Sequence, residues 1–280
     1  MRLIDFVHRY GQSRDVSCDY VKQLVHCVHA VDSTLKRSVQ VNELTADLLN
    51  EFLHKQKGLG LKPNTRKNRR RMLLTLWRNA SANGLVAPIN CVPIAPVRQV
   101  DTIVEAWTSD QVRQLLELAE NLPGNMPKLE LPKALYWGSW IRSAWDSGLR
   151  GCDLRRMERK HIGCEGSVSL VQVKVGKRQR IKLRASTVAC IDRSLCACPR
   201  DLVWPVWTSI PQWRKAAKKL VALAGLPGSI GLLRHSSGTD VELAAPGRGH
   251  EHLGNTRAVF LAHYFDDRLA AFDRPMPREL

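Results

Sequence analysis

A proline-containing stretch near the middle of this 280-residue chain places the strongest limit on its fold. Residues 88–104 read PINCVPIAPVRQVDTIV, with three prolines and no helical spacing of apolar residues. Because proline disfavours a helical conformation of the residue before it, such a stretch is typical of an extended linker. We therefore predict two domains, residues 1–98 and residues 107–280, with the linker reaching to about residue 106.

Helical patterns dominate the sequence before this linker. Residues 14–35 place apolar side chains at spacings of three and four, which predicts a helix with one buried face. A second helix is expected after Thr45, a residue type that caps helix N-termini, and before a pair of glycines. A third helix should begin at Asn64 or Thr65 and run to Gly84. The N-terminal domain is therefore predicted to be helical.

The expected third helix carries a high concentration of positive charge. Seven basic residues and no acidic residue lie between positions 62 and 78, so that face repels itself unless a polyanion neutralises it. The whole chain is also basic, with 43 Lys and Arg against 26 Asp and Glu and a formal net charge of +17, which favours a nucleic-acid partner. The alternative is a solvated basic face. We predict phosphate contacts from Lys62, Arg66, Lys67, Arg69, Arg70 and Arg71.

The composition argues against several other classes of protein. The chain is 44% hydrophobic and 25% charged, values close to a soluble globular average. No run approaches the ~20 apolar residues of a membrane span, and the N-terminus lacks the apolar core of a signal peptide. We therefore expect a cytoplasmic protein associated with the nucleoid.

The eight cysteines follow no regular disulfide framework. Cys190, Cys196 and Cys198 would bind zinc if a fourth ligand such as Cys164 came near, but their spacing matches no standard zinc pattern. We expect packing roles for most of them, and neither a metal nor any other cofactor.

The second half of the chain is expected to combine helices with one β-hairpin. A Thr-x-x-Gln capping box at residues 108–111 predicts a helix start, and residues 134–147 form an apolar helix that a glycine ends. Two β-type runs, 168–175 and 179–183, flank a Gly-Lys-Arg turn, which is a hairpin signal. From Ser209 onward the pattern is helical again, with breaks at two Pro-Gly pairs. Both halves of the chain are basic, so we expect DNA to lie between them.

Five short motifs occur in order in this second half. They are Gly148-Leu149-Arg150 followed by Asp153, a hairpin with Lys174, Leu233-Arg234-His235, Leu253-Gly254-Asn255, and Tyr264. This order resembles the tyrosine recombinase (phage integrase) family. That family has a Gly-Leu-Arg-x-x-Glu/Asp turn, a hairpin lysine, a His-x-x-Arg-His motif and a Leu-Gly-His turn, with a tyrosine nine residues after the last histidine. Tyr264 lies nine residues after Asn255, which fits.

The resemblance covers most of the chain, because the family also carries a small helical DNA-binding domain before the catalytic one. It implies a mainly α fold, with a helical core-binding domain and a mixed α+β catalytic domain in which helices accompany a small antiparallel sheet. It also implies double-stranded DNA as the partner and self-association from dimer to tetramer on DNA. Neither a nucleotide nor a membrane is required.

Physical chemistry gives the motif residues distinct roles. The resemblance implies that Tyr264 attacks a backbone phosphate and forms a 3′-phosphotyrosine, which stores the bond energy for religation. Guanidinium groups of Arg150 and Arg234 can bind the non-bridging oxygens, whose negative charge grows during attack. Lys174 would give a proton to the departing 5′ oxygen. Lys177, in the same turn, is the competitor for this role and is otherwise expected to contact DNA.

Two positions depart from the family pattern. Gly231 stands where the family has His or Lys three residues before the second arginine, and Asn255 stands where it has His or Trp. The family residue at the first position is thought to help accept the tyrosine proton, so its loss should slow cleavage, on a scale of about 10²–10⁴-fold. Asn255 can still donate a hydrogen bond. His235 corresponds to a structural residue of the family, and Asp153 is expected to orient Arg150.

These residues predict site-specific cleavage and rejoining of DNA strands, as in recombination or integration, with reduced activity. The alternative is a DNA-binding protein on the same fold whose cleavage activity has decayed. A third hypothesis is a relaxing enzyme similar to a type IB topoisomerase, for which the chain is short.

Overall fold

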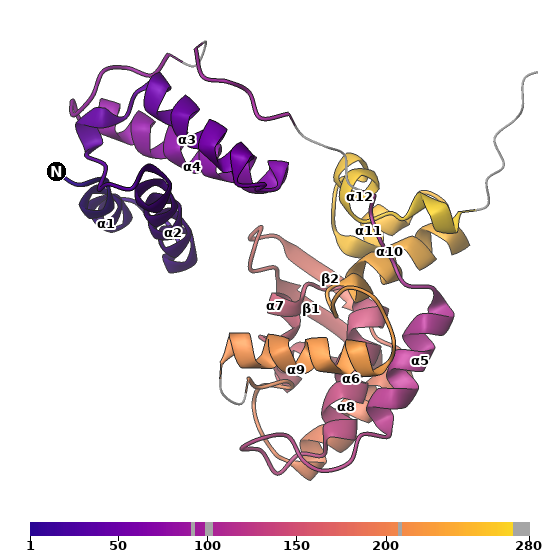
Figure 1. The fold of residues 1–280 in the computed structure, drawn as a ribbon. Coiled ribbons are helices and arrows are strands. Elements are labelled where there is room, and N and C mark those ends of the chain that lie inside the picture. The colour runs from indigo at the N-terminus through magenta and orange to yellow at the C-terminus, as the bar shows by residue number, and fades with distance from the viewer. Residues whose placement is uncertain (91–92, 99–102, 207–208, 271–280) are drawn as a thin grey trace, which may run out of the picture. The chain divides into compact units, whose positions relative to one another are not determined.

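The structure is a computed structural model that describes residues 1–90, 93–98, 103–206 and 209–270. It divides into two compact units, Met1–Thr102 and Ile103–Leu280, and each unit has its own hydrophobic core (Figure 1). The side chain of Cys164 lies outside the described part, as do six residues of the predicted linker, 91–92 and 99–102.

Helices build the first unit. They are α1 (Leu3–Ser13), α2 (Cys18–Leu35), α3 (Ala46–Gly58) and α4 (Pro63–Ala82). The predicted cap of α3 is confirmed, because the Thr45 side chain accepts a hydrogen bond of 3.2 Å from the Leu48 N–H. Helix α4 begins at Pro63, a residue earlier than predicted, since a proline at the first helical position sacrifices no hydrogen bond.

Helix α1 was not among the predicted elements. It buries Leu3, Phe6, Val7 and Tyr10, whose spacing of three and four is the same helical signal that identified α2. The predicted helix over residues 14–35 begins later, at Cys18, because Ser17 caps it by accepting a hydrogen bond from the Tyr20 N–H.

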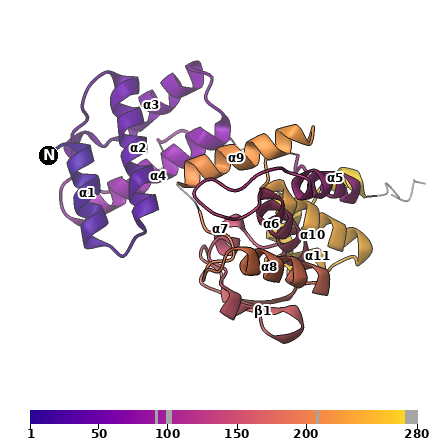
Figure 2. The same ribbon diagram turned by 90° about the horizontal axis from the view of Figure 1, so that it is seen from below.

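The second unit is mainly helical with one small antiparallel sheet, and this predicted fold class is confirmed. Helix α6 lies at its centre and packs against α5, α8 and α10 (Figure 2). Two tryptophans of α6, Trp137 and Trp140, lie 5.5 and 4.8 Å from the ring of Trp213 on α9, measured between centroids. The elements are α5 (Ser109–Glu120), α6 (Lys133–Ser147), α7 (Gly151–Leu154), β1 (Ser167–Val171), β2 (Arg178–Lys182), α8 (Ala185–Ala197), α9 (Ile210–Leu223), α10 (Leu232–Ala244), α11 (Gly249–Leu253) and α12 (Arg257–His263).

The hairpin is shorter than the sequence predicted. Strand β1 ends at Val171, opposite the first residue of β2, so Lys174 lies in the turn and not on a strand. The turn is closed within itself, because the Gln172 N–H donates to the Lys177 carbonyl and the Gly176 N–H donates to the Gln172 carbonyl, both at 2.9 Å. The strand pairing therefore ends at Val171, although the alternation of valines in the sequence continues to Val175.

None of the helices in the described part of the chain is long and apolar enough to cross a membrane. Within the same residues, no group of three or more His, Cys, Asp or Glu side chains is placed to hold a metal ion.

Gly148 ends helix α6 where the sequence predicted a break. Its φ of 56° lies in the left-handed region, and its N–H donates to the Ala144 carbonyl. A methyl group at this position would collide with the Leu253 side chain and approach His252 Nε2 to 2.9 Å. The end of α6 and the end of α11 therefore meet at Gly148, and any other residue type there would displace the side chains of Leu253 and His252.

We predict that Gly148→Ala destabilises the second unit more than Gly225→Ala does. Gly225 also has a positive φ, of 68°, but nothing lies within 4 Å of a methyl group there. The left-handed conformation costs alanine about 1–2 kcal/mol at either site, and the collision at Gly148 should add about 1–3 kcal/mol. Urea unfolding of the two variants measures the difference. Equal midpoints and slopes would contradict the close packing at Gly148.

Candidate active site

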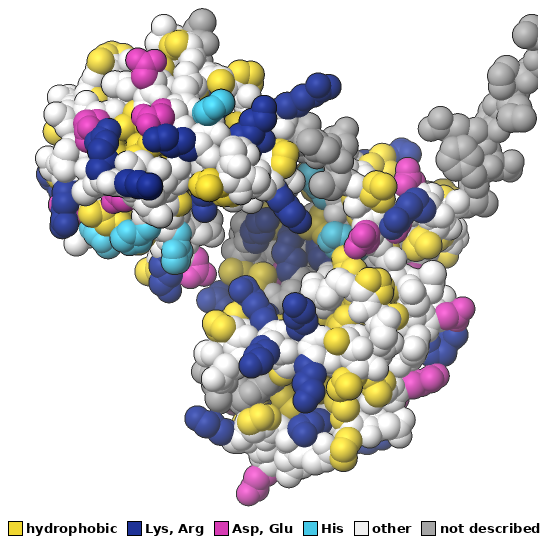
Figure 3. Space-filling view, viewed as in Figure 1, with side chains coloured by type: hydrophobic (Ala, Val, Ile, Leu, Met, Phe, Trp, Pro, Cys, Tyr) yellow, Lys and Arg dark blue, Asp and Glu magenta, His cyan; other side chains and the backbone are white. Residues whose placement is uncertain are grey.

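Positive charge gathers on the face of the second unit that Figure 3 presents. Lys and Arg side chains lie over α9 there, and few acidic side chains interrupt them. The sequence of α9 itself contains no acidic residue, and its basic residues are Arg214, Lys215, Lys218 and Lys219.

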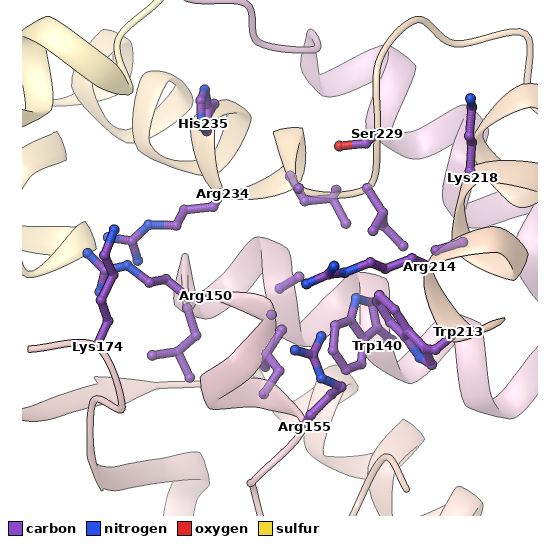
Figure 4. A pocket seen from close by; sticks show the side chains of 18 of the residues that line it. Trp140, Arg150, Arg155, Lys174, Trp213, Arg214, Lys218, Ser229, Arg234 and His235 are labelled. Carbon is purple, nitrogen blue, oxygen red and sulfur yellow. The ribbon is translucent and has the colours of Figure 1, made fainter. Parts of the chain in front are cut away.

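A cavity of about 540 Å³ lies on this unit and draws its lining from α6, α7, the hairpin turn, α9, α10 and the end of α12 (Figure 4). No acidic side chain is among its lining residues in the described chain. The predicted site residues that line it are Arg150, Lys174, Gly231, Arg234, His235 and Tyr264.

Arg234 is buried, with 6% of its surface exposed, and it is held by neutral acceptors. Its guanidinium donates to the carbonyls of Gly148 and Leu253 and, at 3.4 Å, to Asn255 Oδ1. None of the described salt bridges includes it. Since carbonyl and amide dipoles fix the group without cancelling its charge, the charge remains available to an anion in the cavity.

Arg150 follows the glycine that ends α6 and is held in the same way. Its Nη1 donates to Gln172 Oε1 at 3.2 Å, and its Nη2 donates to Asn255 Oδ1 at 3.3 Å. Asn255 therefore links the two arginines through one amide oxygen, although its side chain does not line the cavity. Its neighbour Gly254, with a φ of 64°, lets the α11 end approach the hairpin, since a methyl group there would lie 3.2 Å from Gln179 Cδ.

Asp153 does not orient Arg150, and that prediction is corrected by the structure. Its Oδ1 accepts a hydrogen bond of 2.8 Å from the backbone N–H of Val173, the residue before Lys174. Its Oδ2 is buried and has no hydrogen-bond partner among the described residues. Arg150 donates instead to the side-chain oxygen of Gln172, which comes from the hairpin. Asp153 instead fastens the turn that carries Lys174.

Tyr264 is the residue that follows helix α12. Its backbone carbonyl accepts a hydrogen bond of 3.2 Å from the Thr239 hydroxyl, which fixes the end of the helix against α10. Its ring lies against two residues of α10, with Arg234 Cζ 4.8 Å from the ring centroid and the His235 ring at 5.0 Å.

The environment of Tyr264 lowers the pKa of its hydroxyl. Burial alone would raise this pKa, but the positive charges of Arg234 and Arg150, together with hydrogen bonding from both guanidinium groups, outweigh it. A phenolate at this position is therefore easier to form than in a free tyrosine. That is the property required of a tyrosine nucleophile.

The pKa values of two histidines near Arg234 are lowered, which favours the neutral form of each ring. Burial lowers the pKa of His235, and the charge of Arg234 lowers it further, against a hydrogen bond to the Glu105 backbone that raises it. Burial and Arg234 likewise lower the pKa of His252. The His252 Nε2 is 2.7 Å from the Ser237 hydroxyl, and this contact fixes the orientation of the His252 ring.

Gly231 stands just before α10 and leaves open space in the cavity wall. Its φ of −63° is helical and suits any residue. Within 4 Å of a methyl group built there, the described residues contribute only Ser229 Oγ, at 3.4 Å. The space beside the Gly231 backbone is therefore open to a side chain.

The remaining predicted residues lie elsewhere. Lys177 is exposed in the hairpin turn and does not line the cavity, so Lys174 is the turn lysine at this site. The basic residues of α4 belong to the first unit. Two of them also have structural contacts, because Arg66 donates to the Leu61 carbonyl and Arg70 to the Ile94 carbonyl, at 3.3 and 3.5 Å.

The site also contains residues that the sequence analysis missed. Gln172 is 1% exposed, and a polar residue between the valines of a β-type run was the signal that could have identified it. Gln179 continues the chain of contacts, since it accepts from Gln172 Nε2 and donates to the His252 carbonyl at 3.1 Å. The cavity is further lined by Arg155, Arg214, Lys218 and Ser229, for which no motif gave a signal.

No protein-family model and no curated protein matches this sequence. Several solved structures match its fold. A lambda integrase (75–356) dimer bound to a COC′ core site superposes with a TM-score of 0.75 at 19% identity, covering 99% of this chain and 100% of that one. The XerH site-specific recombinase bound to a palindromic difH substrate gives 0.71 at 18% identity, covering 91% of this chain and 79% of that one. The Tn1549 transposon integrase in complex with circular intermediate DNA gives 0.68 at 15%, covering 98% and 97%.

These likenesses extend over both units of the chain and establish the tyrosine recombinase fold. The fold expected from the motif order is thereby confirmed. At identities below 20% they do not by themselves establish an activity.

The lowered pKa of Tyr264 gives a direct prediction. Arg150→Gln removes one of the two nearby charges and keeps a hydrogen-bonding amide, so the pKa of Tyr264 should rise. The phenolate absorbance, followed against pH and corrected with Tyr264→Phe, reports this group alone. Lys177→Gln removes a charge outside the cavity and should leave the titration unchanged. A wild-type Tyr264 that titrates at or above the ordinary value of 10.0 would contradict the arrangement.

Proposed function

We propose that this protein cleaves and rejoins DNA strands through a covalent 3′-phosphotyrosine at Tyr264. One observation carries the proposal. The Tyr264 side chain shares a cavity with Arg150 and Arg234, whose charges no described carboxylate cancels and which together lower the pKa of the hydroxyl. A phosphodiester entering this cavity would meet a nucleophile and two guanidinium groups suited to its non-bridging oxygens.

The reaction would proceed by exchange of one ester bond for another. Tyr264 Oη forms a bond to phosphorus while the bond to the 5′ oxygen breaks, and the Lys174 ammonium gives its proton to that oxygen. The phenolic proton passes to water, at a cost that the lowered pKa reduces. Arg150 and Arg234 bind the non-bridging oxygens throughout. Rejoining is the reverse, in which a 5′ hydroxyl attacks phosphorus and returns its proton to Lys174, while Tyr264 leaves as a phenolate and takes a proton from water.

The partner would be double-stranded DNA. The exposed Lys67 and Arg71 of α4, with Lys62 just before it, supply charge for phosphate contacts in the first unit, and the basic α9 does so in the second. We assign DNA binding to residues 1–98 and catalysis to residues 107–280. Lambda integrase has been solved as a dimer on a core site and as a tetramer on a Holliday junction. On this basis we propose self-association on DNA, in recombination or integration at a specific site in the cytoplasm.

A second candidate function is DNA binding without cleavage. It is favoured by the open space at Gly231, the position of the family's proton acceptor, where the described residues contribute only Ser229 Oγ within 4 Å of a built methyl group. Asn255 adds to this, because its oxygen is engaged by both arginines and its Nδ2 has no partner among the described residues.

Covalent capture distinguishes the two functions. The full-length protein is incubated with a pool of nicked duplexes of randomised sequence, in which cleavage releases a short fragment and traps the intermediate. We expect DNA that remains attached to the protein after denaturation, and its sequencing identifies the target site. Tyr264→Phe should leave no attached DNA, because it removes the attacking oxygen while keeping the ring that packs on Arg234 and His235.

Attached DNA in the Tyr264→Phe variant would refute the nucleophile assignment. If the wild type binds duplex DNA in a salt-dependent manner but never forms an adduct, the non-cleaving function is correct. Arg193→Gln, which removes an exposed charge from α8 outside the cavity, serves as the control and should retain adduct formation.

We predict that Gly231→His accelerates cleavage. The helical φ accepts a side chain, and the open space beside Ser229 receives it, so an imidazole can take the phenolic proton. Proton transfer of this kind contributes about 10²–10⁴-fold, and we expect an increase at the lower end, near 100-fold. Single-turnover cleavage rates measure it. Gly231→Ala fills the space without a base and should not accelerate cleavage, and a histidine variant no faster than Gly231→Ala would contradict the prediction.

A further inference from the structure

The cavity contains a second group of cations that the proposed chemistry does not use. Arg155, in the segment after α7, and Arg214, on α9, both line it. Figure 4 shows the two side chains reaching into the cavity from different elements, with their guanidinium groups close to each other. Arg214 points towards the side of the cavity where Arg150 and Arg234 lie.

Neither guanidinium is paired with an acidic side chain in the described part of the protein. Among the described residues, no salt bridge and no carboxylate hydrogen bond involves Arg155 or Arg214. Arg155 lies over the ring of Trp213, with its Cζ 5.2 Å from the centroid, a contact that holds the group while leaving its charge intact. Burial lowers the pKa of Arg155, and the nearby charge of Arg214 lowers it further. Two like charges therefore lie together without an anion.

The charge of the cavity exceeds what one phosphodiester can balance. The attacked phosphate carries a single negative charge, and Arg150, Arg234 and Lys174 already surround it with three positive ones. The positive charges of Arg155, Arg214 and Lys218, which also line the cavity, are then left without a balancing phosphate. A DNA strand supplies further phosphates, one for about every 3.4 Å of helix axis, so a strand placed for attack by Tyr264 brings a neighbouring phosphate with it.

We propose that Arg155 and Arg214 form a second phosphate site, which binds the phosphodiester adjacent to the one attacked by Tyr264 on the same strand. The identity of the attacked phosphate rests on the proposed function, whereas the ability of the cavity to bind two linked phosphates does not. Two anchored phosphates would fix both the position and the direction of the strand. A single anchored phosphate would leave the strand free to rotate about it.

Two small probes test this without knowledge of the target sequence. Thymidine 3′,5′-bisphosphate carries two phosphates across one sugar, as a DNA strand does, and thymidine 5′-monophosphate carries one. Calorimetric titration of the full-length protein should show about tenfold tighter binding of the bisphosphate, the effect of an added charge-assisted contact. In Arg214→Gln this preference should fall to about twofold or less. Because Arg214 is exposed, the variant is expected to fold.

Two further variants complete the experiment. Arg193→Gln removes an exposed charge from α8, outside the cavity, and should keep the wild-type preference. Arg155→Lys keeps the charge but loses the planar fork, and should weaken the preference in part. Absence of a bisphosphate preference in the wild type, or its retention in Arg214→Gln, overturns the second phosphate site. Failure of covalent capture with the preference intact refutes only the proposed cleavage and leaves the second site standing.

Discussion

Two positive charges held by neutral groups are the constraint on which the rest of this structure depends. No described salt bridge pairs Arg150 or Arg234 with a carboxylate, and the fold instead surrounds them with carbonyl and amide oxygens. Several elements are placed to deliver these oxygens. The end of α6, the end of α11 and the hairpin all meet at the arginines, and the close contacts at Gly148 and Gly254 are what allow them to meet.

The acidic side chain nearest in sequence illustrates this arrangement. Asp153 lies three residues after Arg150, yet its hydrogen bond is made to the backbone of the hairpin turn. Burying a carboxylate beside an arginine would create an ion pair and consume the charge that an incoming phosphate needs. A glutamine oxygen can accept the same hydrogen bond from an arginine without carrying a charge, and Gln172 does so for Arg150.

Sequence motifs located the centre of the site but not its surroundings. Arg150, Arg234 and Tyr264 were predicted to belong together because their order and spacing along the chain resemble those of the tyrosine recombinase family. The partner of Asp153 was wrongly predicted, because hydrogen bonds across a hairpin turn depend on where the strand ends. Arg155 and Arg214 were missed for a related reason: about sixty positions separate them, and only the contact of the segment after α7 with α9, where Arg155 lies over Trp213, brings them to one cavity.

The fastening of the hairpin turn has a consequence for the timing of any reaction at this site. Tyr264 is fixed to α10 through Thr239, and the arginines are fixed by the ends of three elements. Lys174 alone is carried by an exposed turn, which Asp153 holds through the backbone of Val173. Gln172 belongs to the same closed turn and holds Arg150 through its side chain. A displacement of the turn would therefore move the lysine and loosen one of the two anion-binding groups at the same time, while Tyr264 and Arg234 stayed in place.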